Sequence, residues 1–406
     1  MVMKKEGKKI QRVQTYRCEN GHSVTLKKRV VWDDGFIEHV VYVYLRCLSL
    51  NTTIDIIREQ YEQDILTKGL ILDFIEAVAD VIPTLDELDS IYQPVRSGYI
   101  AVDGVWFHFD AEEMVLLVAF DPDTFDILIA RWEEDETEYG YERLLTDVVN
   151  KLKAVNVKGI YSDGDHGFIR CVKRLLPTVP LQVCVFHKEL RMGQIVPVKS
   201  VRLSKQLTNK QKHDIKVFQL LFRDVIYADT KEQPIAALKR LQQYVESDMH
   251  EYPERFAKAY RSLTHNFKYT LTHFDHPQMK RDNNLLECFN GIIKPRLTLM
   301  KSFKKKENLN RYLKLFLTEF RFHPLKESRF KERNGNSPLE IADASLPKFY
   351  NFLTFFRMQL HLIVFISIIF INHNKFDISI LHSFLFLVFL SFVYVLQKTF
   401  FLSKTL

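Results

Sequence analysis

Three acidic residues stand in sequence settings that favour metal-dependent chemistry on phosphate esters. Asp103 lies inside the apolar run 99–109, Asp163 follows the apolar run 157–161, and Glu287 lies in an asparagine-rich segment. Burying an unpaired carboxylate costs on the order of 5 kcal/mol unless a cation or hydrogen bonds compensate it. Two Mg²⁺ or Mn²⁺ ions about 4 Å apart can activate a water or a 3′-hydroxyl group and stabilise the leaving oxygen of a phosphodiester. We therefore predict that these three acids are catalytic and hold two such ions.

Other acidic positions nearby have simpler structural explanations. An Asp-Gly pair such as Asp103-Gly104 commonly forms a turn, so Asp103 is a candidate only in the company of the other two acids. Asp110 falls at an expected turn and is not a candidate. We expect Asp165 to shape the turn after Asp163 rather than to bind metal.

The segment 283–290 has a polar face if it is helical. Asn283 and Glu287 are four residues apart. Asn284, Glu287 and Asn290 are spaced by three, so these groups share one side of the helix. We expect that side to face metal and DNA. Three apolar residues should pack away from it: Leu285, Leu286 and Phe289.

His187 is a further candidate catalytic residue. It follows Cys184 at a Cys-x-x-His spacing, at the end of an apolar run that we predict to be a strand. Each residue also has an ordinary alternative, Cys184 as a strand cysteine and His187 as a capping histidine.

The apolar runs predict the elements that position these residues. Three strands joined by short turns form an antiparallel meander, at 99–107, 114–120 and 125–132. A helix, a strand, a helix and a fifth strand follow, at 139–155, 157–161, 166–176 and 181–186. This order predicts an α/β fold with a mixed five-stranded sheet of the RNase H-like type. In that fold the fourth strand pairs beside the first, which brings Asp163 close to Asp103.

The pattern divides the chain into six parts. Before the core, apolar residues recur at helical spacing in three segments between 36 and 82, with Asn51-Thr52 and Thr67 as expected N-caps. An acidic linker is expected between Pro83 and Pro94. The parts are a basic N-terminal arm (1–35), a helical DNA-binding region of helix-turn-helix type (36–92), the first part of the catalytic core (93–188), a helical insertion (189–280), the last part of the core with basic helices (281–346) and a hydrophobic tail (347–406).

Charge is distributed unevenly along the chain. The segment 1–30 has nine cations and two acids, the segment 84–150 has three cations and seventeen acids, and the segment 287–333 has thirteen cations and five acids. Basic segments on both sides of an acidic core favour a polyanionic partner over ordinary solvated surfaces. The residues that we expect to contact double-stranded DNA are Lys27, Lys28, Arg29, Asn284, Lys294, Arg296, Lys304 and Lys305.

Cysteine usage indicates a reducing compartment. The five cysteines are dispersed without a Cys-x-x-Cys pair, and the N-terminus has no signal-peptide pattern. We therefore expect a cytoplasmic, nucleoid-associated protein. Cys18 and His22 have the spacing of half a zinc site, but zinc binding there stays open because four ligands are required.

The segment 349–406 differs from the rest of the chain. It lacks Ala, Gly, Pro and Glu, and it holds thirteen of the thirty-two phenylalanines. The uncharged run 378–396 is long enough to span a bilayer, so a membrane partner is expected only if this tail is native and inserted. Our preferred interpretation is a tail derived from a frameshift in AT-rich DNA.

At the residues described above, the chain resembles the DDE transposases of prokaryotic insertion sequences, a group related to the Mutator-like transposases. The resemblance covers about residues 36–345 and is carried by three motifs, 162–168, 182–187 and 283–296. It implies that the catalytic triad is Asp103, Asp163 and Glu287 and that the Cys-x-x-His signature is Cys184 and His187. It also implies metal-dependent strand cleavage at the ends of the mobile element, transfer of the 3′-hydroxyl ends into target DNA, and a homo-oligomeric transposition complex.

The chain departs from that family at both ends. Many relatives have a fuller zinc ribbon near the N-terminus, whereas Cys18 and His22 remain here, and the sequence after Leu346 is unlike the family. Two alternatives to an active transposase therefore stay open. One is a catalytically dead, DNA-binding transposon remnant. The other is an RNase H-like nuclease or resolvase that cuts without strand transfer.

Overall fold

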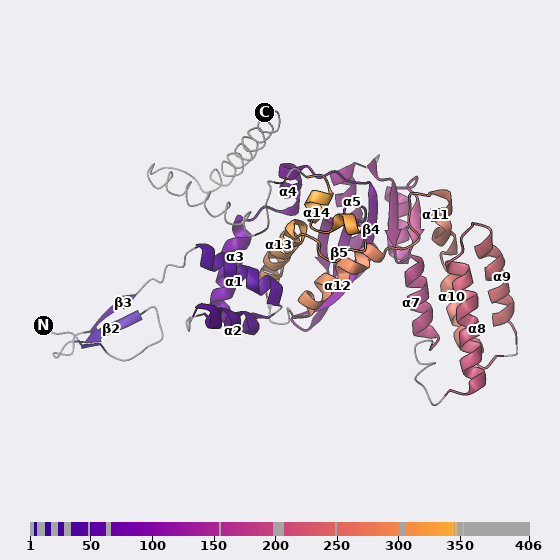
Figure 1. Ribbon diagram of the computed structural model, residues 1–406, viewed down its shortest axis with the longest axis horizontal. Helices are drawn as coiled ribbons and strands as arrows, with labels where there is room; N and C mark the ends of the chain where they lie inside the picture. The colour runs from indigo at the N-terminus through magenta and orange to yellow at the C-terminus, as the bar shows by residue number, and fades with distance from the viewer. Residues whose placement is uncertain are drawn as a thin grey trace. The chain divides into compact units, whose positions relative to one another are not determined.

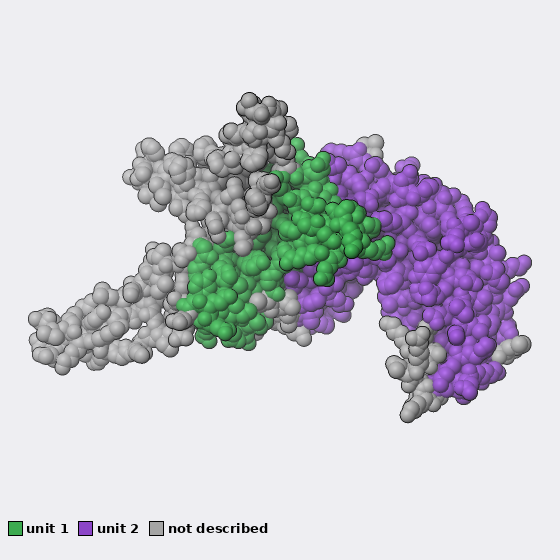
Figure 2. Space-filling model, viewed as in Figure 1, with its two compact units in different colours: residues 1–94, 299–406 green, residues 95–298 purple. Residues whose placement is uncertain are grey.

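The computed structural model describes residues 34–47, 49–61, 66–153, 156–197, 207–247, 250–299, 305–344, 346 and 352, together with the backbone of three short strands nearer the N-terminus. These residues form two compact units, one made of 1–94 with 299–406 and one made of 95–298 (Figure 2). Several predicted features lie outside the described residues: Cys18, His22, Lys28, Arg29, Lys304, the side chain of Lys27 and, apart from Phe352, the tail 347–406.

The N-terminal segment contains a small antiparallel sheet where the sequence predicted only a basic arm. Its strands are β1 (Lys4–Lys5), β2 (Val13–Arg17) and β3 (Ser23–Lys27), in the order β1-β2-β3. The segments of β2 and β3 are rich in Val and Thr, which favour strands. The many charged residues of this segment led to the prediction of a basic arm without strands.

The first unit is otherwise helical, and it confirms the three predicted helices. These are α1 (Asp34–Cys47), α2 (Leu50–Tyr61) and α3 (Lys68–Val81). Thr67 caps α3 as predicted, with its hydroxyl accepting from the Leu70 N–H. The prediction of Asn51-Thr52 as the cap of α2 was wrong, because α2 begins at Leu50 and Ser49 Oγ accepts from the Thr52 N–H.

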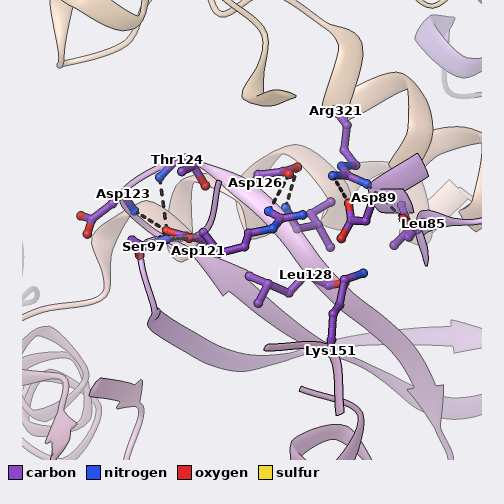
Figure 3. Close-up of polar contacts among 12 residues, drawn as sticks. Leu85, Asp89, Ser97, Asp121, Asp123, Thr124, Asp126, Leu128, Lys151 and Arg321 are labelled. Atoms are coloured by element: carbon purple, nitrogen blue, oxygen red, sulfur yellow. Dashed lines mark hydrogen bonds and ion pairs between the residues drawn. The ribbon is translucent and has the colours of Figure 1, made fainter. Parts of the chain in front are cut away.

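The expected acidic linker after α3 is in part a helix, α4 (Leu85–Tyr92). Thr84 and Glu87 form a capping box, in which each side chain accepts from the other residue's backbone N–H. Arg321, from α13 (Lys306–Phe322), is fully buried and binds Asp89 of α4 at 2.5 Å (Figure 3). The unit ends with the short helices η5 (Lys331–Arg333) and α14 (Pro338–Ile341).

The second unit contains the predicted mixed five-stranded sheet. Its strands are β4 (Tyr99–Phe109), β5 (Glu112–Asp121), β6 (Asp126–Glu133), β7 (Gly159–Ser162) and β8 (Leu181–Val183). They lie in the order β6-β5-β4-β7-β8, with β4 to β6 antiparallel and β7 and β8 parallel to β4. The prediction that the fourth strand pairs beside the first is therefore confirmed.

Helices cover this sheet and supply its core (Figure 1). The helices α5 (Glu138–Leu152) and α6 (His166–Leu175) share one apolar cluster with alternate residues of β4 and β5, among them Val102 and Leu117. Asp103, which alternates with Val102, points to the opposite face. On that face Phe289 of α12 (Asn284–Leu299) stacks on Phe120 at 5.6 Å between ring centroids.

The predicted fifth strand was too long. It ends at Val183, and α7 (Val185–Ile195) begins two residues later, so His187 lies in the first turn of a helix. The apolar run continues through the boundary because Val185 is buried as well. Such a short run cannot distinguish a strand from a buried helix by periodicity alone.

The region predicted as an inserted helical segment consists of α8 (Asn209–Ile226), α9 (Gln233–Val245) and α10 (Pro253–Thr264), followed by η3 (Phe267–Leu271) and α11 (Thr272–Asp275). Helices α7 to α10 share a separate apolar cluster, in which Phe218 and Phe256 stack at 4.4 Å. In the described part of the chain, no helix has the length and apolar character needed to cross a membrane.

Candidate active site

Asp103 lies in the middle of a paired strand and not in a turn. It is opposite Val118 in the antiparallel pairing of β4 with β5. One carboxylate oxygen accepts the Gly104 N–H at 2.9 Å, and the other accepts Asn290 Nδ2 of α12 at 2.8 Å. The sheet therefore fixes the backbone of Asp103, and α12 fixes its carboxylate.

Two further residues converge on Asp103 from different helices. They are His187 of α7 and Glu287 of α12. One imidazole nitrogen, one oxygen of Glu287 and one oxygen of Asp103 all lie within 4.8 Å of one another. His187 Nε2 is 2.9 Å from Glu287 Oε1. The Cys184 thiol accepts the backbone N–H of Asn283 at 3.2 Å, which joins the start of α7 to the start of α12.

The pKa values of this group are shifted by burial and by the neighbouring charges. Burial raises the pKa of Asp103 well above its usual range, and the charges of Glu287 and Asp163 raise it further, whereas His187 lowers it. The hydrogen bond from His187 lowers the pKa of Glu287. Burial alone would lower the pKa of His187, but its contacts with Cys184 and Glu287 raise it to about 11. Either a protonated imidazole or a bound cation can balance the two carboxylates.

The donor set fits a divalent cation. Among the described residues, Asn290 Oδ1, both polar atoms of the Asn283 side chain and His187 Nδ1 are buried without a hydrogen-bond partner. Asn283 directly precedes α12, and Asn290 lies within it and donates its Nδ2 to Asp103. Carboxylate and amide oxygens suit Mg²⁺ or Mn²⁺, and imidazole nitrogen is tolerated better by Mn²⁺.

Asp163 lies outside this close group. It follows β7 directly, its side chain is exposed, and its carboxylate accepts the Asp165 N–H at 3.0 Å. Asp165 caps α6 by accepting the Phe168 N–H at 2.9 Å, in agreement with the predicted turn-shaping role. The charge of Asp163 still raises the pKa of Asp103. Asp110 is exposed at the β4–β5 turn with a positive φ of 45°, which is typical of a turn residue.

Of the predicted DNA-contacting residues with described side chains, three belong to α12. Lys294 is exposed two turns after Glu287, and its charge lowers the pKa of that carboxyl group. Arg296 is half-buried and donates to the Ile292 carbonyl at 2.7 Å. Asn284, at the start of α12, donates its N–H to Asp282 at 3.3 Å. Lys305 is exposed in the other unit, directly before α13.

The sequence analysis missed one carboxylate, Glu136, which lies between β6 and α5. Burial raises its pKa to about 7, and the charges of Asp163 and Asp165 contribute, whereas a hydrogen bond from Trp106 opposes the shift. Gly104 was the sequence signal that could have indicated such a contact with β4, because an isolated glycine inside a strand indicates close approach of another group.

His187 and Glu287 belong to two of the motifs that carry the resemblance to transposases. Asp103, which converges with them, is the residue that this resemblance implies as the first acid of the catalytic triad. No curated protein matches the chain significantly. The sequence profile of the family described as "Transposase, Mutator family" matches residues 26–323. Because this match covers more than two thirds of the 406 residues, the chain belongs to the Mutator family of transposases.

Proposed function

We propose that this chain is a DDE transposase of a prokaryotic insertion sequence, a polynucleotidyl transferase that cleaves DNA at the element ends and joins the 3′-hydroxyl ends to target DNA. The observation that carries the proposal is the convergence of Asp103, His187 and Glu287 within a Mutator-family transposase. These residues come from three elements that are far apart in the sequence, and a bound divalent cation would compensate the charge of their carboxylates.

An RNase H-like core for this enzyme is part of the same proposal. The sheet order β6-β5-β4-β7-β8, with antiparallel pairing on one side of β4 and parallel pairing on the other, is the order expected for that fold. It supports an active site at β4 and the end of β7, where Asp103 and Asp163 lie.

The residues that would hold Mg²⁺ or Mn²⁺ are Asp103, Glu287 and Asp163. When bound, such ions activate the attacking hydroxyl and stabilise the leaving oxygen of the phosphodiester. The chain's own groups fix the geometry. Asn290 Nδ2 holds one oxygen of Asp103, and His187 Nε2 holds Glu287 Oε1 by a hydrogen bond at 2.9 Å.

DNA binding is assigned to the basic parts of the chain. The exposed Lys294 is placed to contact a phosphate beside Glu287, and Arg296 follows it on α12. The helices α1 to α3 are proposed as a DNA-binding region of helix-turn-helix type. Recognition of two element ends suits a homo-oligomer.

The test is an assay of cleavage and strand transfer by the full chain on DNA that carries the element ends, with Mg²⁺ or Mn²⁺. Asp103→Asn and Glu287→Gln should each lower cleavage by about 10³-fold or more while DNA binding is retained, because each removes a charge that holds the ion. Asp110→Asn is the matched control, since Asp110 is an exposed turn residue on the same strand hairpin.

The other readings of the sequence predict different results in this assay. Cleavage without joining would identify a nuclease or resolvase, and DNA binding without cleavage would identify a remnant. Full activity of either active-site variant would remove that residue from the site.

A further inference from the structure

A cavity of about 450 Å³ lies at the edge of the sheet, between the C-terminal end of α6, the start of β8 and the segment that forms η3 and α11. Its volume is in the range of small-ligand sites. The three residues that converge at the candidate active site do not line it. The polar side chains that line it are Lys173, Thr178, Lys268, Tyr269, Asp275 and His276. The cavity is therefore separate from the acidic site.

Two lysines reach this cavity from different elements and meet at one tyrosine. The ammonium group of Lys173, on α6, lies 5.2 Å from the centroid of the Tyr269 ring, and that of Lys268, on η3, lies 4.9 Å from it. Burial would raise the pKa of Tyr269, but hydrogen bonds and charge from the two lysines lower it. Two like charges held beside the same hydroxyl group repel each other unless an anion is bound by both.

The protein does not balance the charge of these two lysines. In the described part of the chain, no carboxylate forms an ion pair with Lys173 or Lys268. Asp275 also lines the cavity, but Lys231 donates to its two carboxylate oxygens at 2.6 and 2.7 Å. The cavity therefore has an excess of positive charge.

The two arginines of α6 differ from Lys173 in this respect. Arg170 binds Glu138 of α5 at 2.7 Å. Arg174 binds Glu138 at 3.3 Å and Glu142, also of α5, at 3.0 Å. These pairs join α6 to α5, whereas Lys173 points to the cavity. Of the three cations of α6, Lys173 is therefore the one that is available to a ligand.

We propose that Lys173, Lys268 and Tyr269 form a phosphate-binding site that holds a backbone phosphate of DNA. The proposal rests on the proposed function, because the DNA is the substrate of that reaction. Ammonium and hydroxyl groups are common partners of DNA phosphates. A phosphate bound by both lysines replaces their repulsion with two charge-assisted hydrogen bonds.

Helix α6 places this site relative to the acidic one. It begins three residues after Asp163, and its ten residues span about 15 Å towards the cavity. Successive base pairs of a duplex are about 3.4 Å apart along the axis. The bound phosphate should therefore lie about four base pairs from the position of cleavage, outside the segment that is cut.

The experiment measures binding of the full chain to a duplex that carries the element ends, by fluorescence anisotropy at several salt concentrations. The double variant Lys173→Gln with Lys268→Gln should bind about tenfold more weakly at 0.1 M salt. The slope of log affinity against log salt should fall in magnitude by about 1 to 2, because fewer counterions are released. Replacement of both lysines by arginine should keep wild-type binding.

The matched control is Lys216→Gln with Lys239→Gln, which removes two exposed lysines from α8 and α9. It changes the net charge equally and should leave affinity within about twofold of the wild type. Thermal unfolding should be the same in both double variants, since all four lysines are exposed. Hydroxyl-radical footprinting should show that the Lys173, Lys268 variant loses protection about four base pairs from the cleavage position and keeps it elsewhere.

The outcomes separate this site from the proposed function. Wild-type affinity and salt slope in the Lys173, Lys268 variant, with cleavage by the wild type, would overturn the phosphate site alone. An equal loss in the control variant would also overturn it, because net charge would then explain the effect. Titration with inorganic phosphate is a further arm. Phosphate that binds the wild type and not the variant, with equal DNA binding by both, would overturn DNA as the ligand. No DNA binding by the wild type would overturn both proposals.

Discussion

The central sheet carries acidic residues at two places that differ in burial and in how their carboxylates are satisfied, since Asp121 and Asp126 are buried and Asp103 is half-buried. At the β5–β6 turn, Asp126 is fully buried and is bound by Arg96 at 2.7 Å, and Asp121 accepts hydrogen bonds from Ser97, Asp123 and Thr124 (Figure 3). Asp103, in contrast, accepts one bond from Gly104 and one from Asn290 and faces other acids.

This difference separates structural from functional charge. The carboxylates at the turn are completed by protein donors, so they hold the chain entering β4 against the turn. The carboxylates around Asp103 have other acids and the imidazole of His187 as neighbours, and unpaired amide atoms lie beside them. Buried charge that the protein does not complete is the better indicator of a ligand site.

The largest expected effect would come from breaking the structural site. Asp126→Asn leaves the nearly buried Arg96 without its counter-charge and should lower the free energy of unfolding by about 3–5 kcal/mol. Asp103→Asn removes a carboxylate that the charges of Glu287 and Asp163 disfavour. In the absence of metal, the free energy of unfolding of this variant should equal or exceed that of the wild type. Denaturant unfolding in EDTA compares the two variants, and equal losses would contradict the distinction.

Divalent metal should stabilise one site and not the other. At a Mn²⁺ concentration about 100 times the dissociation constant, binding should add about 2.7 kcal/mol to the stability of the wild type. The same addition should do little for Asp103→Asn, whereas Asp121→Asn should respond like the wild type. Thermal unfolding with and without Mn²⁺ makes this measurement. An equal response of Asp103→Asn would place the ion elsewhere.

Removal of the imidazole should have an intermediate effect on activity. His187→Gln breaks the 2.9 Å contact that orients Glu287, and losses of this kind lower activity by about 10–100-fold. Cleavage of DNA that carries the element ends is the readout. His166→Gln, which changes an exposed histidine on α6, serves as the control. Wild-type cleavage by His187→Gln would leave His187 only a structural role.

The smallest expected effect is a pH dependence at the turn. Burial raises the pKa of Asp121, although the hydrogen bonds from Ser97, Thr124 and Asp123 lower it. The folded state therefore binds this proton more tightly than the unfolded state, whose Asp pKa is about 3.9. The resulting stability is present below that pH and is lost as the pH rises through the raised value. The free energy of unfolding of the wild type and of Asp121→Asn should be measured between pH 4 and 7. The wild type should become less stable relative to the variant as the pH rises, and a constant difference between the two would contradict this.

Local sequence signals predicted much of the fold. The apolar runs gave the strands of the sheet to within a few residues, apart from β8, and the Thr67 cap and the helices α1 to α3 follow from spacing and hydrogen-bonding side chains next to one another in the chain. The capping box at Thr84 and Glu87 is also a local signal and predicts the start of α4. The prolines on either side of this segment led instead to the prediction of a linker. Local patterns of this kind report on interactions between residues within a few positions.

The sequence by itself therefore determined the class of fold, the family and the acids Asp103 and Glu287 as candidates, because strand and helix periodicity and the motif residues are local properties. Only the tertiary structure decided that His187 belongs to the close group, that Asp163 lies outside it, and that Glu136 rests on Gly104. These placements depend on where a strand ends, where α7 begins and how segments more than thirty positions apart pack together. Such contacts are set by burial and steric fit in three dimensions, which spacing along the chain does not encode.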